Sequence, residues 1–302
     1  MEYRKLGSLE VSLVGIGCNN FGWRADAAEA AAVVDAALDA GINFFDTADI
    51  YGAGQSEEFL GIALKGRRRQ AIIATKFGMK LGEAEGGAGP SYIRKSLDAS
   101  LRRLQVDTID LYQIHCPDPN TPIAETMEAL NDALKAGKVR EIGCSNFTVE
   151  QIRAARATPG SRHFASVQNE YSMMKRDAED NVLPECARTH ITFLPYFPLA
   201  NGLLTGKYRK GKPFPESSRG KDSFGPKVFT PENLKRVETL FAFAESRGHS
   251  LLELAFSWLA ARPEISSIIA GAKTPDQVRE NGQATSWKLM PNELLHVDRI
   301  LH

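Results

Sequence analysis

Four side chains suited to proton transfer follow apolar runs of strand length. The first of three successive runs ends at Asp46, and Tyr51 follows five residues later. The second run ends at Lys76, and the third ends at His115. In a parallel sheet the carboxyl ends of the strands lie on one side, so a carboxylate, a phenol, an ammonium and an imidazole can meet there. Their combination indicates an acid–base site.

The chemistry of this group follows from the ordinary pKa values of its members. Tyr51 titrates near ~10 when unperturbed, so at neutral pH it can donate a proton to a carbonyl oxygen. We expect the ammonium of Lys76 to lower the pKa of Tyr51 by roughly 1–3 units. Asp46 would hold Lys76 charged, and His115 could hydrogen-bond the substrate oxygen. The group suits carbonyl reduction or proton abstraction, and its phenol and ammonium argue against a metal site built from Asp46, Asp49 and His115.

The elements that must position these groups alternate along the chain. Strand-like runs occupy residues 12–16, 42–46, 71–75, 109–114, 139–143, 164–167, 191–195 and 266–269. Helical patterns separate the runs, which implies parallel pairing with right-handed crossovers. Eight such units predict a (β/α)8 TIM barrel, formed as a single domain over residues 1–302. An open doubly wound sheet is the alternative, but its glycine-rich turn is incomplete at residues 15–20 and 52–57.

Two segments fall outside the alternation. Residues 3–12 read as an N-terminal hairpin around Gly7 and Ser8. Residues 201–230 form a long loop after the seventh strand, and a loop of this length is usually functional or mobile. Its basic residues are Lys207, Arg209, Lys210, Lys212, Arg219, Lys221 and Lys227. We predict a lid that neutralises an anionic cofactor, with a solvated surface loop as the alternative.

Composition bounds the partners and the compartment. The 37 Lys and Arg residues balance 37 Asp and Glu residues, so nothing favours nucleic acid or an anionic membrane as the main partner. The four cysteines form neither a disulfide framework nor a zinc pattern, which suits a reducing cytosol. The start lacks a signal-peptide core, and no apolar run approaches the roughly 20 residues that span a bilayer. We therefore expect a soluble, cytoplasmic protein.

The segment Asp-Thr-Ala-Asp-Ile-Tyr-Gly at residues 46–52 resembles the signature of the aldo-keto reductase family. Nearly the whole chain follows the family pattern, with further matching segments at residues 15–22, 107–115, 137–147, 168–171 and 202–207. The resemblance implies a barrel that binds NAD(P)H extended across its carboxyl face, without a Rossmann domain. It also implies a catalytic tetrad of Asp46, Tyr51, Lys76 and His115, with Tyr51 as the general acid.

The same resemblance implies a set of cofactor contacts. The carboxamide would be held by Ser145, Asn146 and Gln168, and the nicotinamide ring would stack on Tyr196. The pyrophosphate would lie along Pro198, Leu199, Gly202 and Lys207. The adenosine end would be surrounded by Gly271, Lys273, Gln277 and Asn281. Two departures stand out. Gly271 and Ala272 occupy positions where many members carry a lysine and a serine, which leaves Lys273 as the nearest base for a 2′-phosphate. Phe197 replaces the serine that many members carry after the stacking tyrosine.

These observations predict NADPH-dependent reduction of aldehydes or ketones to alcohols, with NADP preferred over NAD. The expected partner is a small-molecule carbonyl substrate, and the sequence does not specify an oligomeric state. Phe21 and Trp23, after the first strand, are expected to wall the substrate pocket, with packing at the barrel rim as the alternative. A nicotinamide-binding regulatory or redox-sensing subunit is the second hypothesis. A cofactor-free lyase or isomerase with Tyr51 as its base is the third.

Overall fold

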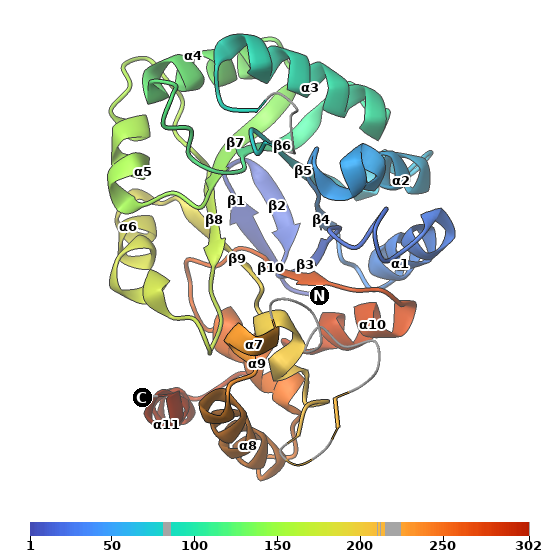
Figure 1. The fold of residues 1–302 in the computed structure, drawn as a ribbon, viewed down its shortest axis with the longest axis vertical. Coiled ribbons are helices and arrows are strands. Elements are labelled where there is room, and N and C mark those ends of the chain that lie inside the picture. The colour runs from blue at the N-terminus through green and yellow to red at the C-terminus, as the bar shows by residue number, and fades with distance from the viewer. Residues whose placement is uncertain (81–85, 210, 212, 215–224, 302) are drawn as a thin grey trace.

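Eight parallel strands form a nearly closed barrel at the centre of the molecule, with helices around it (Figure 1). The structure is a computed structural model that describes residues 1–80, 86–209, 211, 213–214 and 225–301. In spatial order the strands are β10 (Ile268–Gly271), β3 (Val14–Gly17), β4 (Phe44–Asp46), β5 (Ile72–Phe77), β6 (Ile109–Ile114), β7 (Val139–Ser145), β8 (Ser166–Glu170) and β9 (Thr192–Tyr196). All are paired in parallel, as the alternation of strands and helices predicts.

The two edge strands of this sheet meet, and this meeting decides the fold. The backbone N–H of Phe193 in β9 donates to the carbonyl of Glu264, just before β10, at 2.7 Å. The N–H of Ser266 returns a 3.3 Å hydrogen bond to the carbonyl of Phe193. The sheet therefore curls round on itself. The (β/α)8 barrel prediction is confirmed, and the open doubly wound alternative is wrong.

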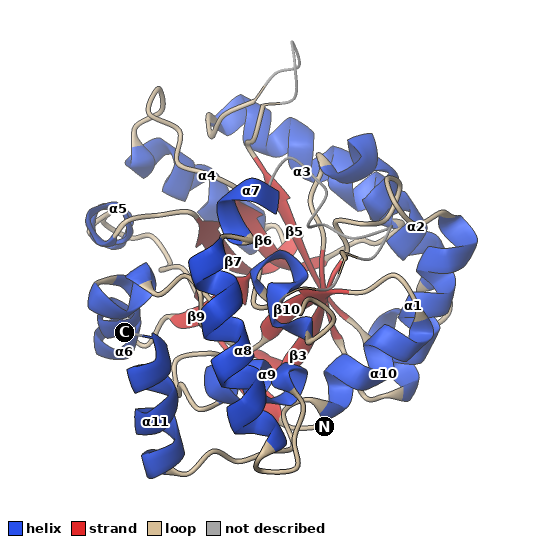
Figure 2. Ribbon diagram, turned by 60° about the horizontal axis from the view of Figure 1, so that its bottom comes forward, coloured by secondary structure: helices blue, strands red, loops and turns tan. Residues whose placement is uncertain are grey.

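Helices cover the outer face of the barrel (Figure 2). Their bounds are α1 (Ala27–Asp39), α2 (Gln55–Ala63), α3 (Pro90–Leu104), α4 (Ile123–Lys135), α5 (Val149–Arg156), α6 (Val182–Thr189), α8 (Pro231–Glu245), α9 (Leu251–Ala260), α10 (Pro275–Gln283) and α11 (Pro291–Leu301). Asp26 is the N-cap of α1: its side chain accepts from the Glu29 N–H at 2.9 Å, while the Glu29 carboxylate accepts from the Asp26 N–H. No helix in the described ranges is long and apolar enough to cross a membrane.

The predicted hairpin is formed by β1 (Tyr3–Leu6) and β2 (Leu9–Ser12), which pair antiparallel. Its apolar side chains, Leu6, Leu9 and Val11, are buried in a second small core. That core also contains Phe44, Ala74, Leu111, Leu194 and Ile269 from five barrel strands. The Ser8 N–H donates to the Glu141 carboxylate near the start of β7, and the Ser12 N–H donates to the Asn43 amide oxygen just before β4, so the hairpin covers the end opposite the predicted site.

The segment after the seventh barrel strand is long, as predicted, but it is not wholly irregular. It contains the 3-10 helix η4 (Ala200–Thr205) and the short helix α7 (Gly225–Val228), which the composition does not indicate. Arg209 pairs with Glu238 of α8 at 2.7 Å, so its charge is already engaged. Lys210, Lys212, Arg219 and Lys221 lie outside the described residues, and the lid remains a prediction.

Candidate active site

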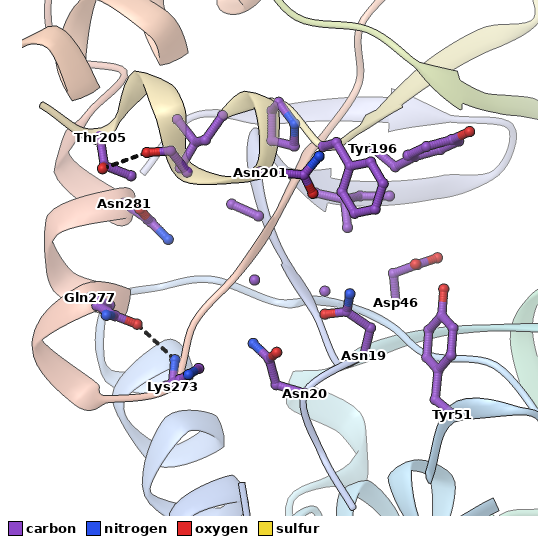
Figure 3. Close-up of a pocket in the computed structure, with 18 of the residues that line it drawn as sticks. Asn19, Asn20, Asp46, Tyr51, Tyr196, Asn201, Thr205, Lys273, Gln277 and Asn281 are labelled. Carbon is purple, nitrogen blue, oxygen red and sulfur yellow. Dashed lines mark hydrogen bonds between the residues drawn. The ribbon is translucent and has the colours of Figure 1, made fainter. Parts of the chain in front are cut away.

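The carboxyl ends of three neighbouring strands bring the acid–base residues together. Asp46 ends β4, Lys76 is the penultimate residue of β5, and His115 directly follows β6. Tyr51 opens the 3-10 helix η1 (Tyr51–Gly54), which follows β4. A cavity of about 590 Å³ lies at this end of the barrel, lined by Asp46, Tyr51 and His115 among others (Figure 3). Lys76 is fully buried beneath it.

Lys76 and Asp46 form a buried ion pair. The Lys76 Nζ lies 2.5 Å from the Asp46 Oδ2 and donates a second hydrogen bond to the Thr47 carbonyl at 3.0 Å. The other oxygen of Asp46 accepts from the amides of Gln168, at 2.9 Å, and Gln113, at 3.2 Å. Burial acts to lower the pKa of Lys76, but Asp46 and Tyr51 outweigh it, so the pKa is raised. The ammonium is therefore charged and fixed in place, as predicted.

Tyr51 lies beside this ammonium, with the Lys76 Nζ 5.2 Å from the centre of its ring. Burial raises the pKa of Tyr51, and the opposing effect of Lys76 is smaller. The predicted net lowering of this pKa is therefore wrong. Lys76 does favour the phenolate, but removing the phenol from water disfavours it more strongly. The phenol stays protonated at neutral pH, which is the form that a proton donor needs.

His115 is neutral at physiological pH. Burial, assisted by the nearby charge of Lys76, lowers its pKa to about 3. Its ring meets that of Tyr51 edge to face, with centroids 5.8 Å apart at an interplanar angle of 83°. Within the described residues the buried Nδ1 atom has no hydrogen-bond partner. A neutral imidazole in this position can hydrogen-bond a bound oxygen without adding a charge.

The turn that carries Tyr51 depends on glycine. Gly52, Ala53 and Gly54 have φ values of 57°, 55° and 96°, so three consecutive residues are left-handed. A Cβ on Gly52 would lie 2.9 Å from the carbonyl oxygen of Phe21, which leaves no room for a side chain. The sequence thus reverses sharply after Tyr51 and enters α2, and this reversal keeps the phenol at the cavity.

Every residue expected to contact a cofactor lines the same cavity. These are Ser145, Asn146, Gln168, Tyr196, Pro198, Leu199, Gly202, Lys207, Gly271, Lys273, Gln277 and Asn281. The Tyr196 hydroxyl donates to the Asn146 amide oxygen at 2.8 Å, and the Ser145 hydroxyl donates to the Gln168 carbonyl at 2.8 Å. Figure 3 shows the labelled members extending from Asp46 and Tyr51 at one end to Lys273, Gln277 and Asn281 at the other.

The charges of the cavity fit an elongated anion. Lys207, Lys273 and Arg24 line it, whereas the described acids along it are Asp46 and Glu280. Asp46 is already neutralised by Lys76. The balance is therefore positive along the part away from Tyr51, which suits the phosphates of a dinucleotide. The donor set is consistent with a nicotinamide cofactor.

The two aromatic residues expected to wall the substrate pocket are placed differently. Phe21 is fully buried, and Trp23 is 66% exposed. Neither is among the residues that line the cavity. The Arg24 guanidinium stacks 4.1 Å from the centre of the Trp23 ring, so Trp23 contacts a residue that lines the cavity. A direct substrate contact for Phe21 and Trp23 stays a prediction.

Several residues at the site escaped the sequence reasoning. Asn19 and Asn20 line the cavity directly after β3, so the rule that the carboxyl ends of strands carry the site would have found them. Gln113 lies on β6, two residues before His115 at the end of that strand, and a buried polar pair at this spacing faces one side. Asn201 and Glu280 had no such signal, because both belong to helical segments whose positions depend on the folded barrel.

Comparison with known proteins identifies the family of this chain. The aldo/keto reductase family profile matches residues 13–302. "Aldo-keto reductase YhdN" of Bacillus subtilis (strain 168) is 37% identical, over 100% of this chain and 94% of that protein. A "probable voltage-gated potassium channel subunit beta" of Oryza sativa subsp. japonica is 34% identical, over 94% of this chain and 91% of that protein.

A solved structure has the same fold as this chain. The glycerol dehydrogenase AKR11B4 from Gluconobacter oxydans superposes with a TM-score of 0.87 at 33% identity, covering 99% of this chain and 94% of that chain. Both the family profile and the structural likeness span nearly the whole barrel. The chain belongs to the aldo/keto reductase family and is an NAD(P)H-dependent oxidoreductase.

Proposed function

We propose that this protein reduces aldehydes or ketones to alcohols with NADPH, reversibly, and that Tyr51 is the general acid. One observation carries the proposal. A buried, fully paired Lys76–Asp46 ion pair lies against the Tyr51 phenol at the end of a positively charged cavity. This arrangement offers a proton donor and a binding site for an anionic cofactor side by side.

The chain's own residues account for the proton transfer. The Tyr51 hydroxyl donates its proton to the carbonyl oxygen as negative charge develops there. Lys76 stabilises the resulting phenolate, because its ammonium is held beside the ring by Asp46. His115, being neutral, orients the substrate oxygen by a hydrogen bond without competing for the proton. A bound nicotinamide cofactor supplies the hydride.

The remaining lining residues would hold the cofactor. Asn146 and Ser145 present polar groups to the carboxamide, and Tyr196 presents its ring to the nicotinamide. Lys207 would compensate the pyrophosphate charge, and Lys273 a 2′-phosphate, which favours NADPH over NADH. Tighter binding of NADPH than of NADH by the wild type, with no such difference in Lys273→Met, would support this preference.

The four unpaired cysteines suit a reducing compartment, and we propose that the protein is cytoplasmic.

Replacement of Tyr51 tests the proposal directly. We expect Tyr51→Phe to lower kcat for aldehyde reduction by about 10²-fold or more, since the proton donor is lost. The affinity for NADPH, measured by fluorescence titration, should stay within about twofold because the ring remains. Tyr3→Phe, at the opposite end of the barrel, is the matched control. Near wild-type turnover by Tyr51→Phe would show that another group donates the proton.

The similarity to a potassium channel subunit favours testing a second function. A regulatory or redox-sensing subunit would bind NADPH tightly and turn over slowly. We would measure NADPH oxidation with a broad panel of aldehydes and ketones, alongside binding. Tight binding with no turnover for any member of the panel would favour the regulatory function over the reductase.

A further inference from the structure

A buried polar network behind Tyr51 takes no part in the proton transfer proposed above. Glu57, in the first turn of α2, is fully buried and accepts a 2.5 Å hydrogen bond from the Thr75 hydroxyl. Its other carboxylate oxygen accepts from the Arg103 guanidinium of α3 at 2.7 Å. Thr75 is also fully buried and directly precedes Lys76 on β5. One carboxylate therefore joins α2, α3 and the strand that carries the ammonium.

The backbone of the turn between Tyr51 and Glu57 cannot by itself fix the position of Tyr51. Its three left-handed residues include two glycines, which have little intrinsic conformational preference. The first turn of α2 is held instead by side chains. The Ser56 hydroxyl lies 2.8 Å from the Thr47 hydroxyl and 2.9 Å from the Cys18 carbonyl, and Glu57 makes the contact to β5.

We propose that Glu57 and Thr75 are positioning residues, whose hydrogen bond fixes the Tyr51 turn against the strand that carries Lys76. The inference rests on the proposed role of Tyr51. Tyr51 lies in η1, between β4 and α2, and Lys76 lies on β5. The chain is joined to β5 before Tyr51 by a hydrogen bond from the Asp49 N–H to the Lys76 carbonyl at 3.1 Å, and after Tyr51 by the Thr75–Glu57 hydrogen bond, so the separation of Tyr51 and Lys76 depends on both. Their contact changes with small shifts, and misplacement by about 1 Å can cost an enzyme up to ~10²-fold in rate.

The alternative role for this network is stability alone. Glu57 and Arg103 could simply pin α2 to α3, since Arg103 is partly exposed and Glu57 is not. Glu57→Gln would not separate the two roles, because it leaves Arg103 without its carboxylate and can unfold the protein. Thr75→Val keeps the volume of the side chain and the Glu57–Arg103 ion pair, and removes only the hydroxyl.

We expect Thr75→Val to lower kcat by about tenfold, with the NADPH affinity and KM within about twofold of wild type. The alkaline limb of the pH–kcat/KM profile should move to higher pH. Lys76 lowers the pKa of Tyr51, so a looser contact raises that pKa further. Thr75→Ser keeps the hydroxyl and should restore turnover. Thr189→Val is the control, since it removes a buried hydroxyl that donates to the Glu185 carbonyl in α6.

The outcomes separate this inference from the proposed function. A Thr75→Val protein that is as destabilised as Thr189→Val but retains kcat within about twofold, with an unmoved alkaline limb, overturns the positioning role. Equal loss of turnover in Thr75→Ser and Thr75→Val also overturns it, because the hydroxyl would then not matter. Tyr51→Phe with near wild-type turnover would instead overturn the proposed function itself.

Discussion

At the residue scale, burial shifts the pKa values of Tyr51, His115 and Asp49 more than neighbouring charges do, whereas at Lys76 the neighbouring groups prevail. It raises the pKa of Tyr51 against the influence of Lys76, and it lowers the pKa of His115 to about 3. It also raises the pKa of Asp49, behind the Tyr51 turn, to about 6, with the Glu57 charge as the second cause. The exclusion of water therefore favours both the protonated phenol and the neutral imidazole.

Asp49 gives this effect a measurable sign. Its pKa is higher in the folded than in the unfolded state, so folding stability falls as pH rises between about 4 and 6. Asp49→Asn removes this dependence. Urea unfolding should show the variant gaining stability relative to wild type by about 1–1.5 kcal/mol between pH 5 and pH 7. A stability difference between the variant and the wild type that stays constant from pH 5 to pH 7 would show that Asp49 is ionised in the folded protein at both pH values. Asp276→Asn, at an exposed position, controls for the loss of one negative charge.

The identities of the acid–base residues could be predicted from the sequence, but their pKa values could not. Asp46, Lys76 and His115 were found because strand ends converge in a parallel barrel, and this rule needs only the order of elements. The pKa of Tyr51 depends instead on how much water the folded site excludes, and several elements together determine that. Asn201 was missed for a similar reason, since η4 reaches the cavity only through the folded path of the chain.

At the element scale, the close approach of α2 and α3 helps to determine where the Tyr51 turn lies. Gly61 of α2 faces the end of α3, and a Cβ there would be 2.5 Å from the Leu104 carbonyl oxygen. The two helices are therefore in near backbone contact, just beyond the Glu57–Arg103 pair. Strand and helix patterns predicted both elements, but a single glycine in α2 gave no sign of this distance.

Two glycine substitutions should change stability in opposite directions. Gly61→Ala should destabilise the protein by about 1–3 kcal/mol, because the contacted backbone cannot move aside cheaply. Gly282→Ala in α10 meets its nearest neighbour, the Ile42 Cδ1, at an ordinary 3.6 Å. It should stabilise the protein by up to about 1 kcal/mol through helix propensity. Denaturant unfolding measures both, and a neutral Gly61→Ala would mean that α2 and α3 can separate without cost.

At the scale of the whole molecule, the two ends of the barrel have separate roles. The carboxyl end holds the cavity and the acid–base residues, and the hairpin of β1 and β2 covers the other end. Arg4 of β1 links this hairpin to the place where the barrel closes. Its guanidinium donates to the carbonyls of Ile265 and Ala260 at 2.7 Å and to that of Arg262 at 3.2 Å.

This separation predicts a variant that loses stability but not activity. Arg4→Ala removes three hydrogen bonds from a charged donor to carbonyls at the end of α9 and in the segment before β10, and should lower the free energy of unfolding by about 2 kcal/mol. Lys5→Ala, exposed on the same strand, should change it by less than about 0.5 kcal/mol. At 25 °C the folded Arg4→Ala protein should keep its kcat and NADPH affinity, because the hairpin lies at the opposite end from Tyr51. A lower kcat in fully folded Arg4→Ala would show instead that closure of the barrel at β10 is transmitted through the strands to the cavity.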